Sequence, residues 1–144
     1  MSRGQIFYLH LSAVLVTVTG AVFAAMKYFM HSSDEMAVVN HPMQPYMLSG
    51  HVVVAPLLLF GLGWIFANHI WPKFYFREQR NRITGIASML LIGPMTLSGY
   101  LMQVSTADST RKAMAIAHWI TSAVFVIAYV AHLFFKPRGA EGVQ

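Results

Sequence analysis

Two histidines, fourteen residues apart, lie within a long stretch that carries no charged side chain. The stretch runs from Ala113 to Phe135, and the histidines are His118 and His132. On an α-helix this separation spans about 21 Å. It also returns to nearly the same face, because each residue turns the helix by about 100°. Imidazole is an axial ligand of haem iron. The spacing therefore predicts one membrane-length helix with two such ligands on one face, near its opposite ends.

The composition indicates an integral membrane protein. Of the 144 residues, 56% are hydrophobic and only 10% are charged, and the mean hydropathy is +0.53; these values are typical of a chain embedded in lipid. The absence of cysteine excludes thioether-linked haem, iron–sulfur clusters held by this chain, disulfides and thiol catalysis. In a soluble protein the formal charge of +5 would suggest nucleic acid as a partner. Here we interpret it as loop charge that sets orientation, and we expect no nucleic-acid partner.

Four long apolar segments predict an all-α fold in one domain, residues 1–144. The membrane spans are expected at about 4–27, 46–71, 83–106 and 112–135, each long enough to cross about 30 Å of hydrocarbon. Trp71 is expected to end the second span, because the residue before a proline is disfavoured in the helical conformation. The sequence therefore predicts an up-down-up-down four-helix bundle.

The distribution of basic residues predicts the orientation of the spans. One side would carry both termini and seven basic residues, which are Arg3, Lys73, Arg77, Arg80, Arg82, Lys136 and Arg138. The other side would carry Lys27, Arg111 and Lys112. Because basic loops are retained inside the cell, we expect both termini in the cytoplasm. Residues 27–45 and 108–112 are then expected to face outward.

This topology places four histidines at two depths. His51 and His118 lie near the outer side, whereas His10 and His132 lie near the inner side. Each pair comes from two different helices, as a haem with two axial histidines requires. A six-coordinate haem favours electron transfer over oxygen binding. The sequence thus predicts two haem b groups, an outer one held by His51 and His118 and an inner one held by His10 and His132.

His69 belongs to neither pair. It follows His51 by eighteen residues, which is about five helical turns, so it is expected on the same face but about 27 Å away. Three interpretations stay open: an axial ligand that replaces His10, a contact with a quinone or a haem propionate, or a residue at headgroup level with no special role. Candidates for pairing the haem propionates are Arg77, Arg80 and Arg138.

The histidine pattern resembles the cytochrome b subunits of membrane-bound formate dehydrogenases and nickel–iron hydrogenases, and the related stand-alone bacterial four-helix dihaem cytochromes. The resemblance covers all four spans. It rests on His10 followed by Thr19-Gly20, on His51, on the segments RNRITGIASMLL and SGYL, and on AHWITSAVFVIAYVAHLF. It implies the same two ligand pairs and a multi-pass location in the bacterial inner membrane. His69 is not part of the family pattern.

The resemblance also implies a function. Electrons would enter from a dehydrogenase or another redox subunit on the outer face, pass through the two haems, and reduce the membrane quinone near the cytoplasmic side. Residues 71–82 and His69 lie at the depth expected for contact with that quinone.

Three other functions stay open. The same scaffold also serves as a stand-alone enzyme that oxidises superoxide and passes the electrons to quinone. A metal-handling membrane protein is the second, because thioethers suit Cu(I). Its candidate ligands in and beside the outer connection are Met26, Met30, His31, Met36, His41, Met43 and Met47. The third is a structural anchor whose histidines only hydrogen-bond neighbouring helices.

Overall fold

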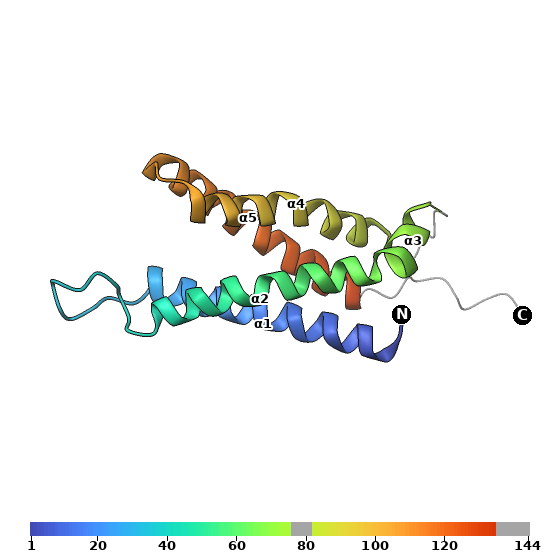
Figure 1. The fold of residues 1–144 in the computed structure, drawn as a ribbon, viewed down its shortest axis with the longest axis horizontal. Coiled ribbons are helices and arrows are strands. Elements are labelled where there is room, and N and C mark those ends of the chain that lie inside the picture. The colour runs from blue at the N-terminus through green and yellow to red at the C-terminus, as the bar shows by residue number, and fades with distance from the viewer. Residues whose placement is uncertain (76–81, 135–144) are drawn as a thin grey trace, which may run out of the picture. The chain divides into compact units, whose positions relative to one another are not determined.

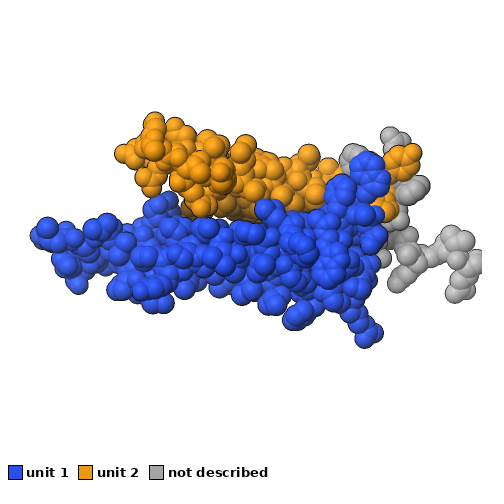
Figure 2. Space-filling view, viewed as in Figure 1, with its two compact units in different colours: residues 1–71 blue, residues 72–144 orange. Residues whose placement is uncertain are grey.

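The computed structural model describes residues 1–75 and 82–134. This part of the chain is mainly helical, with a long connection between the first two helices (Figure 1). It divides into two compact units, residues 1–71 and 72–144, which Figure 2 colours separately. Several residues used in the orientation and propionate predictions lie outside the described residues, namely Arg77, Arg80, Lys136 and Arg138, as does Phe135 at the expected end of the fourth span.

Unit 1 is built on helix α1, Arg3–Tyr28, which packs against helix α2, Gln44–Ile65. Helix α1 begins with a capping box. The backbone N–H of Gln5 donates to Ser2 Oγ at 3.2 Å, and the backbone N–H of Ser2 donates to Gln5 Oε1 at 2.8 Å. These bonds satisfy backbone groups that the first turn of a helix leaves without an intrahelical partner.

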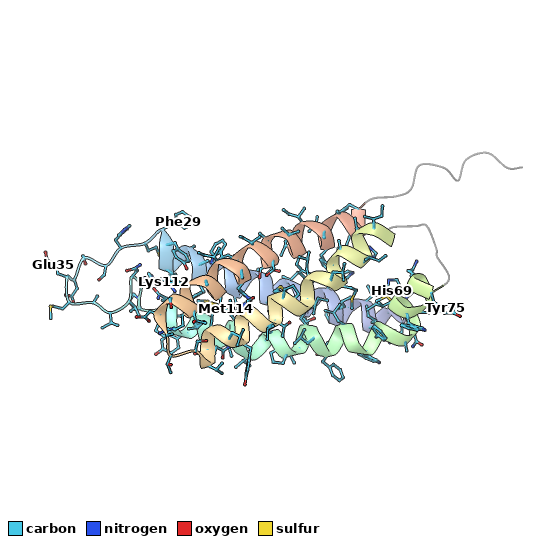
Figure 3. All side chains as sticks on the ribbon, turned by 90° about the horizontal axis from the view of Figure 1, so that it is seen from above. Phe29, Glu35, His69, Tyr75, Lys112 and Met114 are labelled. Atoms are coloured by element: carbon cyan, nitrogen blue, oxygen red, sulfur yellow. The ribbon has the colours of Figure 1, made fainter. Side chains whose placement is uncertain are left out.

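The connection between α1 and α2 folds back onto the end of α1. Asn40 Nδ2 donates a hydrogen bond of 2.8 Å to the carbonyl oxygen of Lys27. A turn within the connection is closed by the Met36 amide, which donates to Asp34 Oδ1 at 2.9 Å. Figure 3 labels Phe29 at the end of α1 and Glu35 at the far end of this segment.

Helix α2 does not end at Trp71, so that part of the prediction is wrong. It continues into a π-helical turn, η1, Phe66–Ile70, and then into α3, Trp71–Tyr75. Pro72 is the second residue of α3. Early in a helical segment the missing proline N–H removes little hydrogen bonding, and the fixed φ of proline suits the helix.

Unit 2 contains helix α4, Arg82–Val104, which packs against helix α5, Asp108–Phe134. The connection between them, residues 105–107, is short, so the two helices run antiparallel. Pro94 lies inside α4. At the start of α5, Arg111 lies 3.8 Å from the carboxylate of Asp108, close to the helix end where a negative charge is favourable.

Four helical segments in the described part of the chain are long and apolar enough to cross a membrane: Arg3–Tyr28, Gln44–Lys73, Ile83–Val104 and Asp108–Phe134. This confirms the predicted all-α class and shows four helices long and apolar enough to be the expected spans. It indicates a multi-pass membrane protein. The assembly of the spans into one bundle and the cytoplasmic location of both termini stay predictions.

Candidate functional site

In unit 2, His118 and His132 lie against glycines of the neighbouring helix. A Cβ atom at Gly99 would come 3.1 Å from Cε1 and 3.2 Å from Nδ1 of His118. A Cβ atom at Gly85 would come 3.2 Å and 3.4 Å from the same two atoms of His132. Both rings thus contact α4, which confirms that the two histidines share one face of α5.

The spacing of the two glycines explains why both contacts form. Gly85 and Gly99 are fourteen residues apart on α4, as His118 and His132 are on α5. In an antiparallel pair of helices, one register therefore brings each imidazole onto a glycine. Because glycine has no side chain, the ring can approach the backbone of the neighbouring helix closely.

Unit 1 contains the same kind of contact at His51. A Cβ atom at Gly20 of α1 would come 2.9 Å from Cε1 and 3.0 Å from Nδ1 of the His51 ring. This is the tightest of the three contacts, and any side chain at position 20 would displace the ring. Three of the four predicted haem ligands are therefore placed on glycines: His51, His118 and His132.

Backbone carbonyls fix the proton position on two of these rings. His118 Nδ1 donates to the carbonyl oxygen of Met95 at 2.8 Å, and His51 Nδ1 donates to that of Val16 at 3.1 Å. A carbonyl can only accept, so Nδ1 carries the proton in both rings. In the neutral imidazole the lone pair then lies on Nε2, which is the arrangement of a metal-ligating histidine with an anchored second nitrogen.

The two acceptors occupy equivalent positions, since Val16 and Met95 each lie four residues before the contacted glycine, Gly20 and Gly99. The outer pair of predicted ligands, His51 and His118, is therefore anchored by the same local arrangement in two different units.

A hydroxyl side chain precedes each contacted glycine, which gives the pairs Thr19-Gly20, Thr84-Gly85 and Ser98-Gly99. Thr84 Oγ1 forms a hydrogen bond of 3.2 Å with Nδ1 of His132, and Thr19 Oγ1 lies 3.4 Å from Nδ1 of His51. Ser98 instead donates to the carbonyl oxygen of Pro94 at 2.6 Å.

Sequence reasoning missed the positions of these hydroxyl–glycine pairs relative to the histidines. A signal was present in the equal spacing of the two glycines and the two histidines along α4 and α5.

His10 lies on α1, ten residues from Gly20, the residue that contacts His51. This separation corresponds to about 15 Å along the helix, so His10 and His51 lie at different levels within unit 1, as predicted. Near His10, the ring of Tyr8 lies against Gly61, where a Cβ atom would come 3.0 Å from Cε1 of the tyrosine. Each predicted haem pair takes one histidine from unit 1 and one from unit 2, and these pairings stay predictions.

His69 lies inside the π-helical turn η1. The prediction that it shares a face with His51 assumed an uninterrupted α-helix, and a π-turn changes the rotation per residue. Figure 3 shows His69 toward the end of unit 1 that lies away from Phe29 and Glu35. Beside it, the rings of Phe66 and Trp71 have centroids 6.0 Å apart. Single π-turns occur frequently at functional sites.

The connection between α1 and α2 offers no cluster of His, Cys, Asp or Glu metal ligands. Within residues 1–75 and 82–134, no group of three or more His, Cys, Asp or Glu side chains could hold a metal ion. His41 Nδ1 accepts a hydrogen bond of 3.1 Å from the Met43 amide. A haem iron requires only two protein ligands, so this finding does not bear on the predicted haem sites.

No family model matches the chain, and no curated protein or solved structure matches it either.

Proposed function

We propose that this chain is a dihaem cytochrome b of the bacterial inner membrane, which carries electrons between a redox subunit on the outer face and the membrane quinone pool. Both termini lie in the cytoplasm. His51 and His118 hold the outer haem, and His10 and His132 hold the inner haem. The supporting observation is the shared anchoring of His51 and His118, in which a carbonyl of the neighbouring helix fixes the proton on Nδ1.

The donor set suits haem iron. Histidine is a common axial ligand of haem iron. A ligating imidazole usually donates a hydrogen bond from its second nitrogen, often to a backbone carbonyl. The glycines at positions 20, 85 and 99 let the rings lie close to the neighbouring helix, and this contact restricts their rotation. A haem with two axial imidazoles supplies one-electron transfer and keeps no open iron position for a substrate.

The residues of the chain have three tasks in this proposal. Apolar helices exclude water from the two ligand levels. The helix pairs hold the imidazoles in one orientation, so that little rearrangement accompanies a change of charge. In the proposed orientation, His69 in the π-turn would face the inner side, where the membrane quinone would meet the protein.

Reduction of the purified chain by a quinol tests the proposed function. Soluble ubiquinol and menaquinol analogues are mixed with the oxidised protein, and the α-band of reduced haem b is followed by stopped-flow absorbance. We expect at least one of the quinols to reduce both haems. Reduction of both haems by dithionite but by neither quinol would contradict a role in electron exchange with quinone.

A further inference from the structure

Two threonine hydroxyls each lie within hydrogen-bond distance of Nδ1 of a predicted haem ligand. Nδ1 is the ring nitrogen that would not bind the iron. Thr84 Oγ1 lies 3.2 Å from Nδ1 of His132, and Thr19 Oγ1 lies 3.4 Å from Nδ1 of His51. Each threonine immediately precedes the glycine on which its histidine ring lies. The histidine ring therefore contacts both the glycine and the hydroxyl of the threonine before it.

The direction of the bond follows from the other partners of Thr19. Its hydroxyl donates to the carbonyl oxygen of Leu15 at 2.7 Å, so the lone pairs of Oγ1 face the imidazole. Nδ1 of His51 carries the proton, because it also donates to the carbonyl of Val16. Thr19 Oγ1 is thus a second acceptor for the same N–H.

If His132 ligates iron through Nε2, as proposed, its Nδ1 carries the proton, and the bond between them runs from Nδ1 to Thr84 Oγ1. An acceptor at Nδ1 makes the imidazole a more basic ligand and holds its orientation. A more basic ligand stabilises the oxidised iron over the reduced iron, which lowers the reduction potential.

We propose that Thr19 and Thr84 are positioning residues, each for a different haem: Thr19 acts through His51 on the outer haem and Thr84 acts through His132 on the inner haem. This inference rests on the proposed function. It assigns to each of the two haem sites a separate side chain that lowers the reduction potential of its haem.

Thr19→Val and Thr84→Val remove the hydroxyl and keep the branched shape of the side chain. We expect each variant to retain two haems per chain and to raise the midpoint potential of one haem only. Thr19→Val should raise the potential of the haem that is lost in His51→Ala. Thr84→Val should raise that of the haem that is lost in His132→Ala. Potentiometric titration followed by optical absorbance measures both values in one experiment.

Two groups of control variants accompany the valine variants. Thr19→Ser and Thr84→Ser keep the hydroxyl and should leave both potentials at their parent values. Ser12→Ala on α1 and Ser88→Ala on α4 remove hydroxyls that donate to their own helix, to the carbonyls of Leu9 and Thr84. These two variants should shift neither potential.

Three results would overturn the inference. The first is a valine variant that shifts neither potential, and the second is one that shifts both equally. The third is a serine variant that behaves like the valine variant. If a valine variant loses its haem, retention of that haem in the matching serine variant supports the hydroxyl contact, and loss in both contradicts it.

A measurement that needs no haem separates this inference from the proposed function. In the chain labelled with ¹⁵N-histidine, NMR reports the tautomer of each ring. Thr84→Val should reduce the share of the Nδ1–H tautomer at His132, and Thr84→Ser should not. A tautomer shift in a chain that binds no haem would contradict the proposed function, and would show that the contact between Thr84 and His132 exists without a haem to act on. A parent chain with two haems and no potential shift in either valine variant would contradict the inference alone.

Discussion

The imidazole of His118 lies so close to Gly99 that a Cβ atom at this position would come within 3.1 Å of Cε1. The same ring donates from Nδ1 to the carbonyl oxygen of Met95, four residues earlier on α4. The contact with Gly99 restricts the position of the ring, and the bond to the Met95 carbonyl fixes its proton on Nδ1. This arrangement recurs at His51 on α2, with Gly20 and Val16 of α1.

Gly99→Ala is expected to weaken the outer haem site. The added methyl group would force the ring of His118 to move by a few tenths of an ångström. Loss of support around a metal ligand typically weakens metal binding by roughly 10-fold or more. We therefore expect faster dissociation of one haem, measured as haem transfer to apomyoglobin.

Gly93→Ala is the matched control for this variant, because a Cβ atom at Gly93 on the same helix would meet nothing within 4 Å. It should retain both haems, because the added methyl group would not reach either histidine ring. Equal haem loss in the two variants would show that the contact with His118 is not the cause.

Gly20→Ala tests the pairing of His51 with His118. Its Cβ atom would come 2.9 Å from the His51 ring, closer than at Gly99, so we expect a loss at least as large. The haem affected should be the one affected by Gly99→Ala, identified by its midpoint potential. Gly63→Ala, where a Cβ atom would meet nothing within 4 Å, is the control. If Gly20→Ala and Gly99→Ala affected different haems, the proposed outer pair would be wrong.

His69→Ala is expected to retain both haems and to slow reduction by quinol. His10 lies in the uninterrupted helix α1, whereas His69 lies in the π-turn, and the proposed function gives the inner haem to His10. His10→Ala should therefore lose one haem. Haem content and stopped-flow rates of the two variants check both statements. Loss of a haem in His69→Ala, with full retention in His10→Ala, would make His69 the axial ligand.

The orientation can be tested with single cysteines, because the chain has none of its own. Val38 in the connection between α1 and α2 is 100% exposed, and Tyr75 at the end of α3 is 68% exposed. We expect an impermeant maleimide to label Val38→Cys in intact cells and Tyr75→Cys only in inverted membrane vesicles. The reverse pattern would place the termini outside.

The four spans could be predicted from the sequence because long apolar runs are a property of local composition. Helix α1, for example, extends to Tyr28, one residue beyond the predicted bound. The continuation of the second span past Pro72 could not be predicted by the rule that proline ends a helix. That rule considers only the residue before proline, whereas here a π-turn precedes a new helical segment that begins at Trp71.

The histidines of the candidate site could be selected from the sequence, but the glycines, carbonyls and hydroxyls that contact them could not. Which glycine meets which imidazole depends on the register between two helices, and composition alone does not give that register. The acceptors at Val16 and Met95 are backbone atoms, so no residue type marks them. Thr84 is an ordinary helix residue until the position of His132 is known.

The haem content of the purified chain tests the central claim most directly. A reduced-minus-oxidised optical spectrum identifies the haem type, and a pyridine haemochrome assay against protein concentration gives the number of haems per chain. We predict two haem b groups per chain, both six-coordinate. Addition of carbon monoxide to the reduced protein should not shift the absorbance bands of either haem. An intact, folded chain without haem would contradict the assignment of His10, His51, His118 and His132 as haem ligands.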